Sequence, residues 1–218
     1  MIKINKGEKP KILHDNSDVW VDDLLGYIHR NEKVPPALGS KYNHPEIKEA
    51  LKKETNSKCM YCESKVGHVS YEHIEHIRPK AKEKYPELTF DWDNLGLACP
   101  KCNMNKSDEF DPFLPLLNPY VDQPSEYLFA AGPYIYGRPG AARGQLTEKL
   151  LDLNRVELIE QRLERIEAIR QLMDSYEKEQ NLTLKKLILK ELLKELGVDK
   201  AYSFVTNSMV KIVDLEAA

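Results

Sequence analysis

The sequence has no long hydrophobic run. None of its apolar stretches reaches about 18 residues, the length that a membrane-spanning helix needs. The first residues, MIKINKGEKPKIL, are too polar for a signal peptide. We therefore expect a cytoplasmic protein without a membrane segment, in a compartment that keeps thiols reduced.

The sequence also lacks an excess of positive charge. Its 32 Lys and Arg residues are outnumbered by 35 Asp and Glu residues, so the formal net charge is −3. Nonspecific DNA coating depends on many Lys and Arg contacts to phosphates, and this balance argues against it. It allows a local basic strip, or a partner that carries the main DNA-binding surface. The 218 residues can still bury one sizeable core.

Cysteine is scarce, and all four cysteines fall into two CxxC pairs. Four thiolates complete the tetrahedron that zinc accepts, and such a closed site leaves no position for a substrate. We predict a structural zinc that holds together both ends of the segment between the pairs. That segment exceeds the about 15–20 residues of a zinc ribbon, which leaves room for a second site. A redox dithiol is the alternative. The predicted zinc ligands are Cys59, Cys62, Cys99 and Cys102.

The pattern of apolar residues predicts a mostly helical α+β protein with a few short strands. A proline at 45 suits the start of a helix, and a glycine at 197 suits the end of one. The predicted helices cover 17–30, 45–56, 183–196 and 200–215, with others beginning near 102 and from 147 onward. The predicted strands cover 66–77 (one strand or two), 94–98, 127–130 and 134–136.

We expect four consecutive segments along the chain. Residues 1–57 form an N-terminal helical lead, and residues 58–110 form a core that contains every cysteine. Residues 111–146 are rich in Pro, Gly and Tyr, which predicts an irregular connector. Residues 147–218 form a helical C-terminal subdomain.

An ordered set of polar residues lies within and beside the cysteine pairs. It reads Glu-His-x-x-Pro at 75–79, Asn-Leu at 94–95, and Asn103 with Lys106 after the last cysteine. This set resembles the HNH family of ββα-metal nucleases. The resemblance implies a zinc-stapled ββα-metal core, meaning one held together by the predicted zinc, and a hydrolase that cuts nucleic-acid phosphodiester bonds.

The residue types suit that chemistry. One divalent cation can neutralise a phosphate and its leaving oxygen together. The oxygens of Glu75 and Asn103 suit a hard ion, Mg²⁺ or Mn²⁺. His76 can accept a proton near neutral pH and is the predicted general base. Asn94 would orient its neighbours, through a hydrogen bond to the backbone or to the imidazole of His76. These are the roles that the family resemblance implies, residue by residue.

Several alternatives remain open for these residues. His76 can be a buried structural histidine, Asn94 a plain turn residue, and Asn103 a helix cap, a role compatible with metal binding. His73 is either an extra ligand or, as we favour, a residue that packs beside the site or supports one of its ligands. Adjacent strand residues point to opposite faces, so Glu75 and His76 share a site only if the strand ends or bulges there.

A local basic strip accompanies the predicted site. We assign Arg78, Lys80 and Lys106 to phosphate-backbone contacts, which position a nucleic acid without reading its sequence. Other basic residues nearby belong to the strip or to a solvated loop. These are Lys82, Lys84 and Lys101.

Phrases outside the core point to a narrower family. MIKINKG, HIEHIRPK, LLNPYVDQPSEYLFAAG and LLDLNRVELIEQR are similar to the HNH subunit of Septu-type and retron-linked anti-phage systems. That resemblance implies a nuclease effector acting with an ABC/SMC-like ATPase. The leucine-rich helices at 155–176 and 183–196 either dock this partner or form the core of the C-terminal subdomain. A non-catalytic, zinc-stapled nucleic-acid-binding or scaffold subunit is the alternative function.

Overall fold

The chain folds around a small β-hairpin followed by a short helix. The computed structural model describes residues 1–67 and 72–210. Its four strands are β1 (His73–His76), β2 (Leu95–Ala98), β3 (Leu128–Ala131) and β4 (Tyr134–Gly137). Its α-helices are α1 (Lys11–His29), α2 (Pro36–Gly39), α3 (Pro45–Thr55), α4 (Pro100–Lys106), α5 (Pro124–Tyr127), α6 (Ala142–Leu150), α7 (Val156–Lys178), α8 (Leu182–Glu195) and α9 (Ser203–Val210).

Strands β1 and β2 pair antiparallel and lead into α4, which gives the ββα unit. The register places Glu75 opposite Gly96 and His76 opposite Leu95. A side chain at Gly96 has no room, because a Cβ there would lie 2.2 Å from the Sδ of Met60. Helix α4 starts where Pro100 takes the first helical position and the Cys99 sulfur accepts a hydrogen bond from the Cys102 amide. The unit therefore places both ends of the cysteine segment close together.

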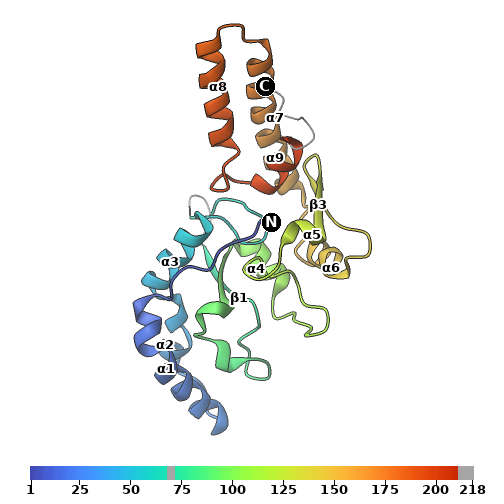
Figure 1. Ribbon diagram of the computed structural model, residues 1–218. Helices are drawn as coiled ribbons and strands as arrows, with labels where there is room; N and C mark the ends of the chain where they lie inside the picture. The colour runs from blue at the N-terminus through green and yellow to red at the C-terminus, as the bar shows by residue number, and fades with distance from the viewer. Residues whose placement is uncertain (68–71, 211–218) are drawn as a thin grey trace.

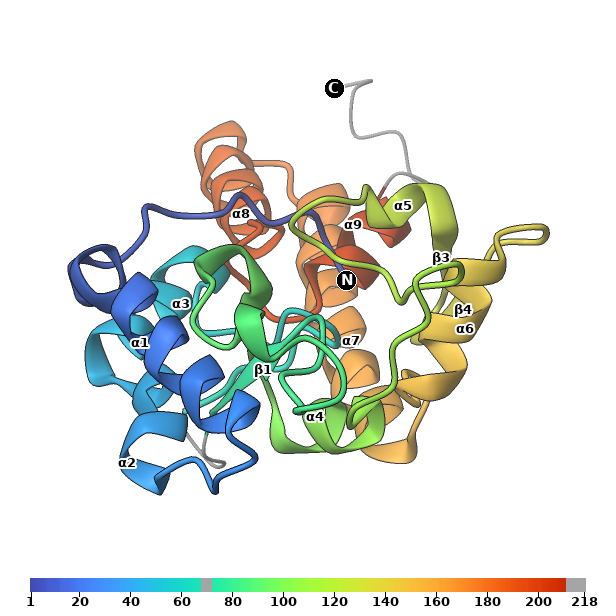
Figure 2. The ribbon, with the colours of Figure 1, turned by 90° about the horizontal axis from the view of Figure 1, so that it is seen from below.

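The N-terminal helices cover one side of this unit. Figure 2 shows α1, α2 and α3 grouped on one side of β1, with α6 and β4 on the other. Helix α3 begins at Pro45 and ends before Asn56, which adopts the left-handed conformation at φ 54°. Its buried face, including Ile47 and Leu51, belongs to the same core as β2. The N-terminal lead thus forms one wall of the site described below.

The connector is more regular than its composition predicts. It contains α5 and the β3–β4 hairpin, and α6 packs against β4. Asp122 and Arg143 form an ion pair at 2.6 Å that joins the connector to α6. A Cβ at Gly144 would lie 2.2 Å from the Tyr127 carbonyl oxygen, so this helix needs glycine at its contact with α5. The two predicted strands of this segment are observed, β3 shifted by one residue and β4 longer by one residue.

Helices α7 and α8 form an antiparallel arm that projects away from the β1–β2 unit (Figure 1). A small separate core of Ile169, Met173 and Leu192 joins the two helices. Large apolar side chains nevertheless remain exposed on the arm. They are Leu163, Leu182, Leu184, Leu187 and Leu193. Among the described residues, no helix is both long and apolar enough to span a membrane.

The predicted mostly helical α+β class, with flanking helices around the cysteine segment, is confirmed, and three boundaries are wrong. Helix α1 begins at Lys11 rather than near 17, because Pro10 provides a compatible entry. Strand β1 covers only His73–His76, and residues 68–71 lie outside the described chain. The helix expected from 147 onward is interrupted after Leu150, where Asp152 adopts φ 49°. The last predicted helix, 200–215, begins at Ser203 as α9, and its residues 211–215 lie outside the described chain.

Candidate active site and metal centre

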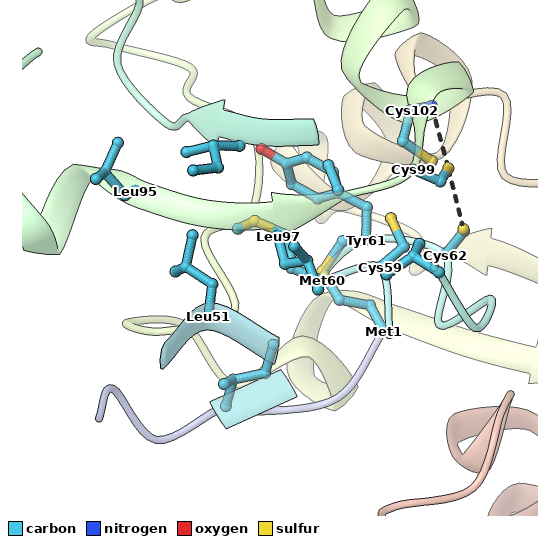
Figure 3. Close-up of a cluster of buried hydrophobic side chains, with 14 of the residues drawn as sticks. Met1, Leu51, Cys59, Met60, Tyr61, Cys62, Leu95, Leu97, Cys99 and Cys102 are labelled. Atoms are coloured by element: carbon cyan, nitrogen blue, oxygen red, sulfur yellow. Dashed lines mark hydrogen bonds between the residues drawn. The ribbon is translucent and has the colours of Figure 1, made fainter. Parts of the chain in front are cut away.

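The four cysteines converge on one point beside the core. Their sulfur atoms all lie within 4.8 Å of one another, and all four residues are buried (Figure 3). The Sγ atoms of Cys62 and Cys99 are 3.8 Å apart, far beyond a disulfide bond. Four sulfurs at about 2.3 Å from one zinc ion would be separated by about 3.8 Å, so the cluster fits a tetrahedral zinc.

A second group of polar residues meets at the end of β1. Glu75, His76 and Asn103 line one cavity of about 590 Å³, together with Lys80 and Thr89. Strand β1 ends at His76, so the alternation of a regular strand stops there. The side chains of Glu75 and His76 consequently border the same cavity, which is the condition for a shared site that was stated above.

Glu75 is a buried carboxylate with an incomplete set of partners. Its residue is 2% exposed, and the Nζ of Lys106 lies 2.7 Å from Oε1. Apart from this ion pair, Oε1 has no hydrogen-bond partner within the described chain. Burial raises the pKa of Glu75 to about 7, although Lys106 opposes the shift. A buried carboxylate oxygen of this kind can serve as a ligand for a cation.

His76 is held as a neutral imidazole. Its Nε2 lies 3.0 Å from the carbonyl oxygen of Thr89, and because a carbonyl only accepts, Nε2 carries the proton. The lone pair is then on Nδ1. The ring of Tyr42 packs edge-on against the imidazole at 4.7 Å between centroids. Burial lowers the pKa of His76 to about 3, so the imidazole is uncharged at neutral pH, and so low a pKa also makes it a weak base.

Asn103 projects from α4 toward the same strand. Its Nδ2 lies 3.1 Å from the Nδ1 of His73, so the amide donates to the imidazole. The amide oxygen is the atom of Asn103 with the chemistry of a cation ligand. His73 therefore contacts Asn103, which is itself a predicted metal ligand, and this contact agrees with a supporting role for His73.

Asn94 has a different task from the one expected of a catalytic residue. It is buried, its Oδ1 accepts from the Arg78 amide at 2.8 Å, and its Nδ2 donates to the carbonyls of Arg78 and Leu88. It thus fixes the loop that follows β1 through backbone groups. Of the two hydrogen bonds predicted for Asn94, to the backbone or to the imidazole of His76, the structure shows the first. The imidazole of His76 is instead held by Thr89, which no motif in the sequence indicated.

The basic strip is only partly accessible. Arg78 is exposed, and its guanidinium lies near the rings of Tyr85 and Phe110. Lys80 lines the cavity, with its Nζ 4.9 Å from the centroid of the Tyr42 ring. The prediction that Lys106 contacts phosphate is wrong. Lys106 is 2% exposed, and besides Glu75 it donates to the His76 carbonyl at 2.9 Å, so it supports the site from inside.

Replacing Lys106 by methionine is expected to lower the free energy of unfolding by about 3–5 kcal/mol, because Glu75 loses its buried counter-charge. Urea denaturation of wild type and Lys106→Met measures this. The double variant Lys106→Met with Glu75→Gln is the control, since it removes both charges and should recover most of the loss. Equal losses in the single and double variants would contradict the assignment of Lys106 as the partner of Glu75.

Comparison with known proteins matches this region. The HNH endonuclease family model covers residues 59–109, which include both CxxC pairs and the cavity residues of β1 and α4. Residues 59–109 therefore form an HNH endonuclease domain. Relatives of this HNH protein include the Septu protein PtuB of Bacillus mycoides (strain KBAB4), 30% identical over 197 residues, covering 74% of this chain and 66% of the relative. The Septu protein PtuB of Bacillus thuringiensis is 34% identical over 119 residues, covering 54% and 45%.

The predicted resemblance to Septu-type HNH subunits is confirmed by these relatives. The matched region spans about two thirds of the first relative and under half of the second. Nothing in the comparison bears on retron-linked systems, so that part stays a prediction. The division of the HNH protein into four segments also stays a prediction.

Proposed function

We propose that this HNH protein is a metal-dependent endonuclease that hydrolyses phosphodiester bonds in nucleic acid. The observation that carries the proposal is the single cavity that brings together Glu75, His76 and Asn103. The buried carboxylate of Glu75 beside this cavity supports a cation there, because carboxylate oxygens are the ligands that Mg²⁺ and Mn²⁺ prefer.

The side chains around the cavity divide the chemical work. Glu75 and Asn103 would hold Mg²⁺ or Mn²⁺, which when bound supplies charge neutralisation at the phosphate and the leaving oxygen. His76 accepts a proton from the attacking water at Nδ1, while its Nε2 keeps its own proton and donates it in a hydrogen bond to the Thr89 carbonyl. Asn94 keeps the loop carrying Arg78 and Lys80 in place, and these two residues position the phosphate backbone.

The four cysteines would hold a structural Zn²⁺ in the same domain. Their sulfur separations and burial fit a closed tetrahedral site. Because one pair precedes β1 and the other lies at the start of α4, this zinc would fix the two elements that carry Glu75 and Asn103. Its role is to set the geometry of the cavity.

We further propose that the protein acts in the cytoplasm as the effector of an anti-phage complex with an ATPase. The Septu relatives support the defence setting, and the family resemblance implies the ABC/SMC-like partner. The α7–α8 arm supports a docking site, because leucines such as Leu182 and Leu187 remain exposed on it. An assembly through the arm would leave the cavity at the other end of the molecule open.

The proposed activity is expected to require a divalent cation. Protein, alone and with its ATPase partner, would be incubated with plasmid DNA or total RNA in Mg²⁺, Mn²⁺ or EDTA. We expect cleavage of one polymer with Mg²⁺ or Mn²⁺ and none in EDTA, and Glu75→Gln should lower the rate by at least about 100-fold. Cleavage that persists in EDTA or in Glu75→Gln would contradict the proposed cation site. Binding without cleavage in every condition would favour the non-catalytic module.

A further inference from the structure

A guanidinium from outside the HNH domain lies against the cysteine cluster. The Nη2 of Arg155 is 3.7 Å from the Sγ of Cys102 and 3.8 Å from that of Cys99, and its Nη1 is 3.8 Å from Cys102. Arg155 immediately precedes α7, the first helix of the arm. The HNH family match ends at residue 109, so this contact is not part of the matched domain.

The charge of the cluster explains why a guanidinium belongs there. Four thiolates around one Zn²⁺ carry a net charge of about −2, and the four cysteines are buried. A buried charge without a partner is costly. Arg155 supplies one positive charge and N–H donors at two of the four sulfurs, which lowers that cost directly.

A second arginine of the arm gives independent support. Arg162 on α7 is fully buried and donates Nη1 hydrogen bonds to the carbonyls of Pro133 and Leu153. Its Nε and Nη2 have no hydrogen-bond partner among the described residues. Burial lowers the pKa of the Arg162 guanidinium, and the negative charges of Cys62 and Glu63 oppose that shift.

The arm also reaches a third sulfur through hydroxyl groups. The hydroxyl of Ser64 lies 3.2 Å from the Sγ of Cys62 and 3.0 Å from the hydroxyl of Tyr202, which hydrogen-bonds Gln161 on α7. Tyr202, after α8, and Gln161, on α7, thus reach the Cys62 sulfur only through Ser64 of the HNH domain. The arm and the cysteine cluster share one polar network.

We propose that Arg155 is a positioning residue of the zinc centre, which offsets the charge of the tetrathiolate and joins the arm to the HNH domain through it. The inference rests on the zinc part of the proposed function. It predicts that zinc retention depends on a residue 53 positions after the last ligand, Cys102. It also makes the zinc centre the junction between the arm and the cavity.

The contrasting explanation is that Arg155 only closes the turn between α6 and α7. Its Nη1 also lies 3.3 Å from the Leu151 carbonyl and 3.1 Å from that of Asp152. A test must therefore include a readout at the metal, which a purely local turn contact would not change. Cobalt substitution provides one, because the sulfur-to-cobalt absorption band responds to hydrogen bonds at the sulfurs.

The experiment compares wild type with Arg155→Met, Arg155→Lys and, as a matched control on the same helix, Arg170→Met. Arg170 is exposed and pairs only with its helix neighbour Glu167 among the acidic groups described. Zinc content, zinc affinity by chelator competition, the cobalt absorption band and the melting temperature are measured for each full-length protein. We expect a zinc affinity about 10- to 100-fold lower in Arg155→Met, a smaller loss in Arg155→Lys, and no change in Arg170→Met.

The possible outcomes distinguish the role of Arg155 from the presence of the zinc centre itself. A red-shifted cobalt band in Arg155→Met, with partial recovery in Arg155→Lys, supports the inference. Unchanged affinity and band position in Arg155→Met, with one zinc per wild-type chain, overturn the inference alone, whatever happens to the melting temperature. A wild-type protein without zinc overturns the proposed zinc centre itself.

Discussion

Replacement of His76 by alanine is expected to lower the rate of nucleic-acid cleavage by about 10²- to 10⁴-fold, because the attacking water loses its proton acceptor. The imidazole is neutral, its Nε2 proton is held by Thr89, and it lines the cavity with Glu75 and Asn103. Single-turnover cleavage of the preferred polymer in Mg²⁺ measures the effect. Zinc content and melting temperature are measured in parallel.

The control for this substitution is His29→Ala. His29 is exposed in the last turn of α1, so its removal leaves the cavity unchanged. We expect wild-type rates in the control and wild-type zinc content in both variants. If His76→Ala cleaved at the rate of the His29→Ala control, His76 would be a structural histidine and the assignment of the base would be wrong.

Loss of the cysteine cluster is expected to prevent stable folding of the HNH domain. Structural zinc contributes about 10 kcal/mol or more of apparent binding free energy, which is comparable to the whole stability of a typical domain. The double variant Cys62→Ser with Cys102→Ser should therefore bind no zinc, lose its cooperative thermal transition, and lose cleavage. Circular dichroism with zinc analysis by mass spectrometry measures this.

A matched substitution on the same helix controls for local disturbance. Met104→Ser changes an exposed residue of α4, 64% accessible, between the last zinc ligand and Lys106. It should retain zinc and the thermal transition. A double cysteine variant that melted cooperatively at the wild-type temperature would show that the cluster does not hold the domain together.

The parts of the site that could be predicted are those set by short-range spacing. Each CxxC pair holds its two thiols close together, and β1 and β2 bring the pairs to one place. The burial of Lys106 could also have been predicted from the spacing of residues on α4. Asn103 and Lys106 are three residues apart on α4, so both face the strand that carries Glu75. A lysine on that face is a partner for the carboxylate rather than a surface contact.

Other parts depend on contacts that spacing does not encode. Thr89 holds His76 because the loop after β1 returns to the strand, and Asn94 fixes that loop through backbone groups. Arg155 reaches the sulfurs because the chain turns at Asp152, where a non-glycine residue adopts positive φ. Hydrophobic periodicity continues through this turn, so the sequence predicted one continuous helical stretch where the structure has two helices.

The most direct test of the central claim is a crystal structure of the protein soaked with Mn²⁺, with anomalous scattering recorded to distinguish manganese from zinc. We expect zinc among the four cysteines and manganese in the cavity, bound by Glu75 and Asn103 beside His76. Manganese absent from the cavity at saturating concentration, or bound there without contact to Glu75 and Asn103, would contradict that claim.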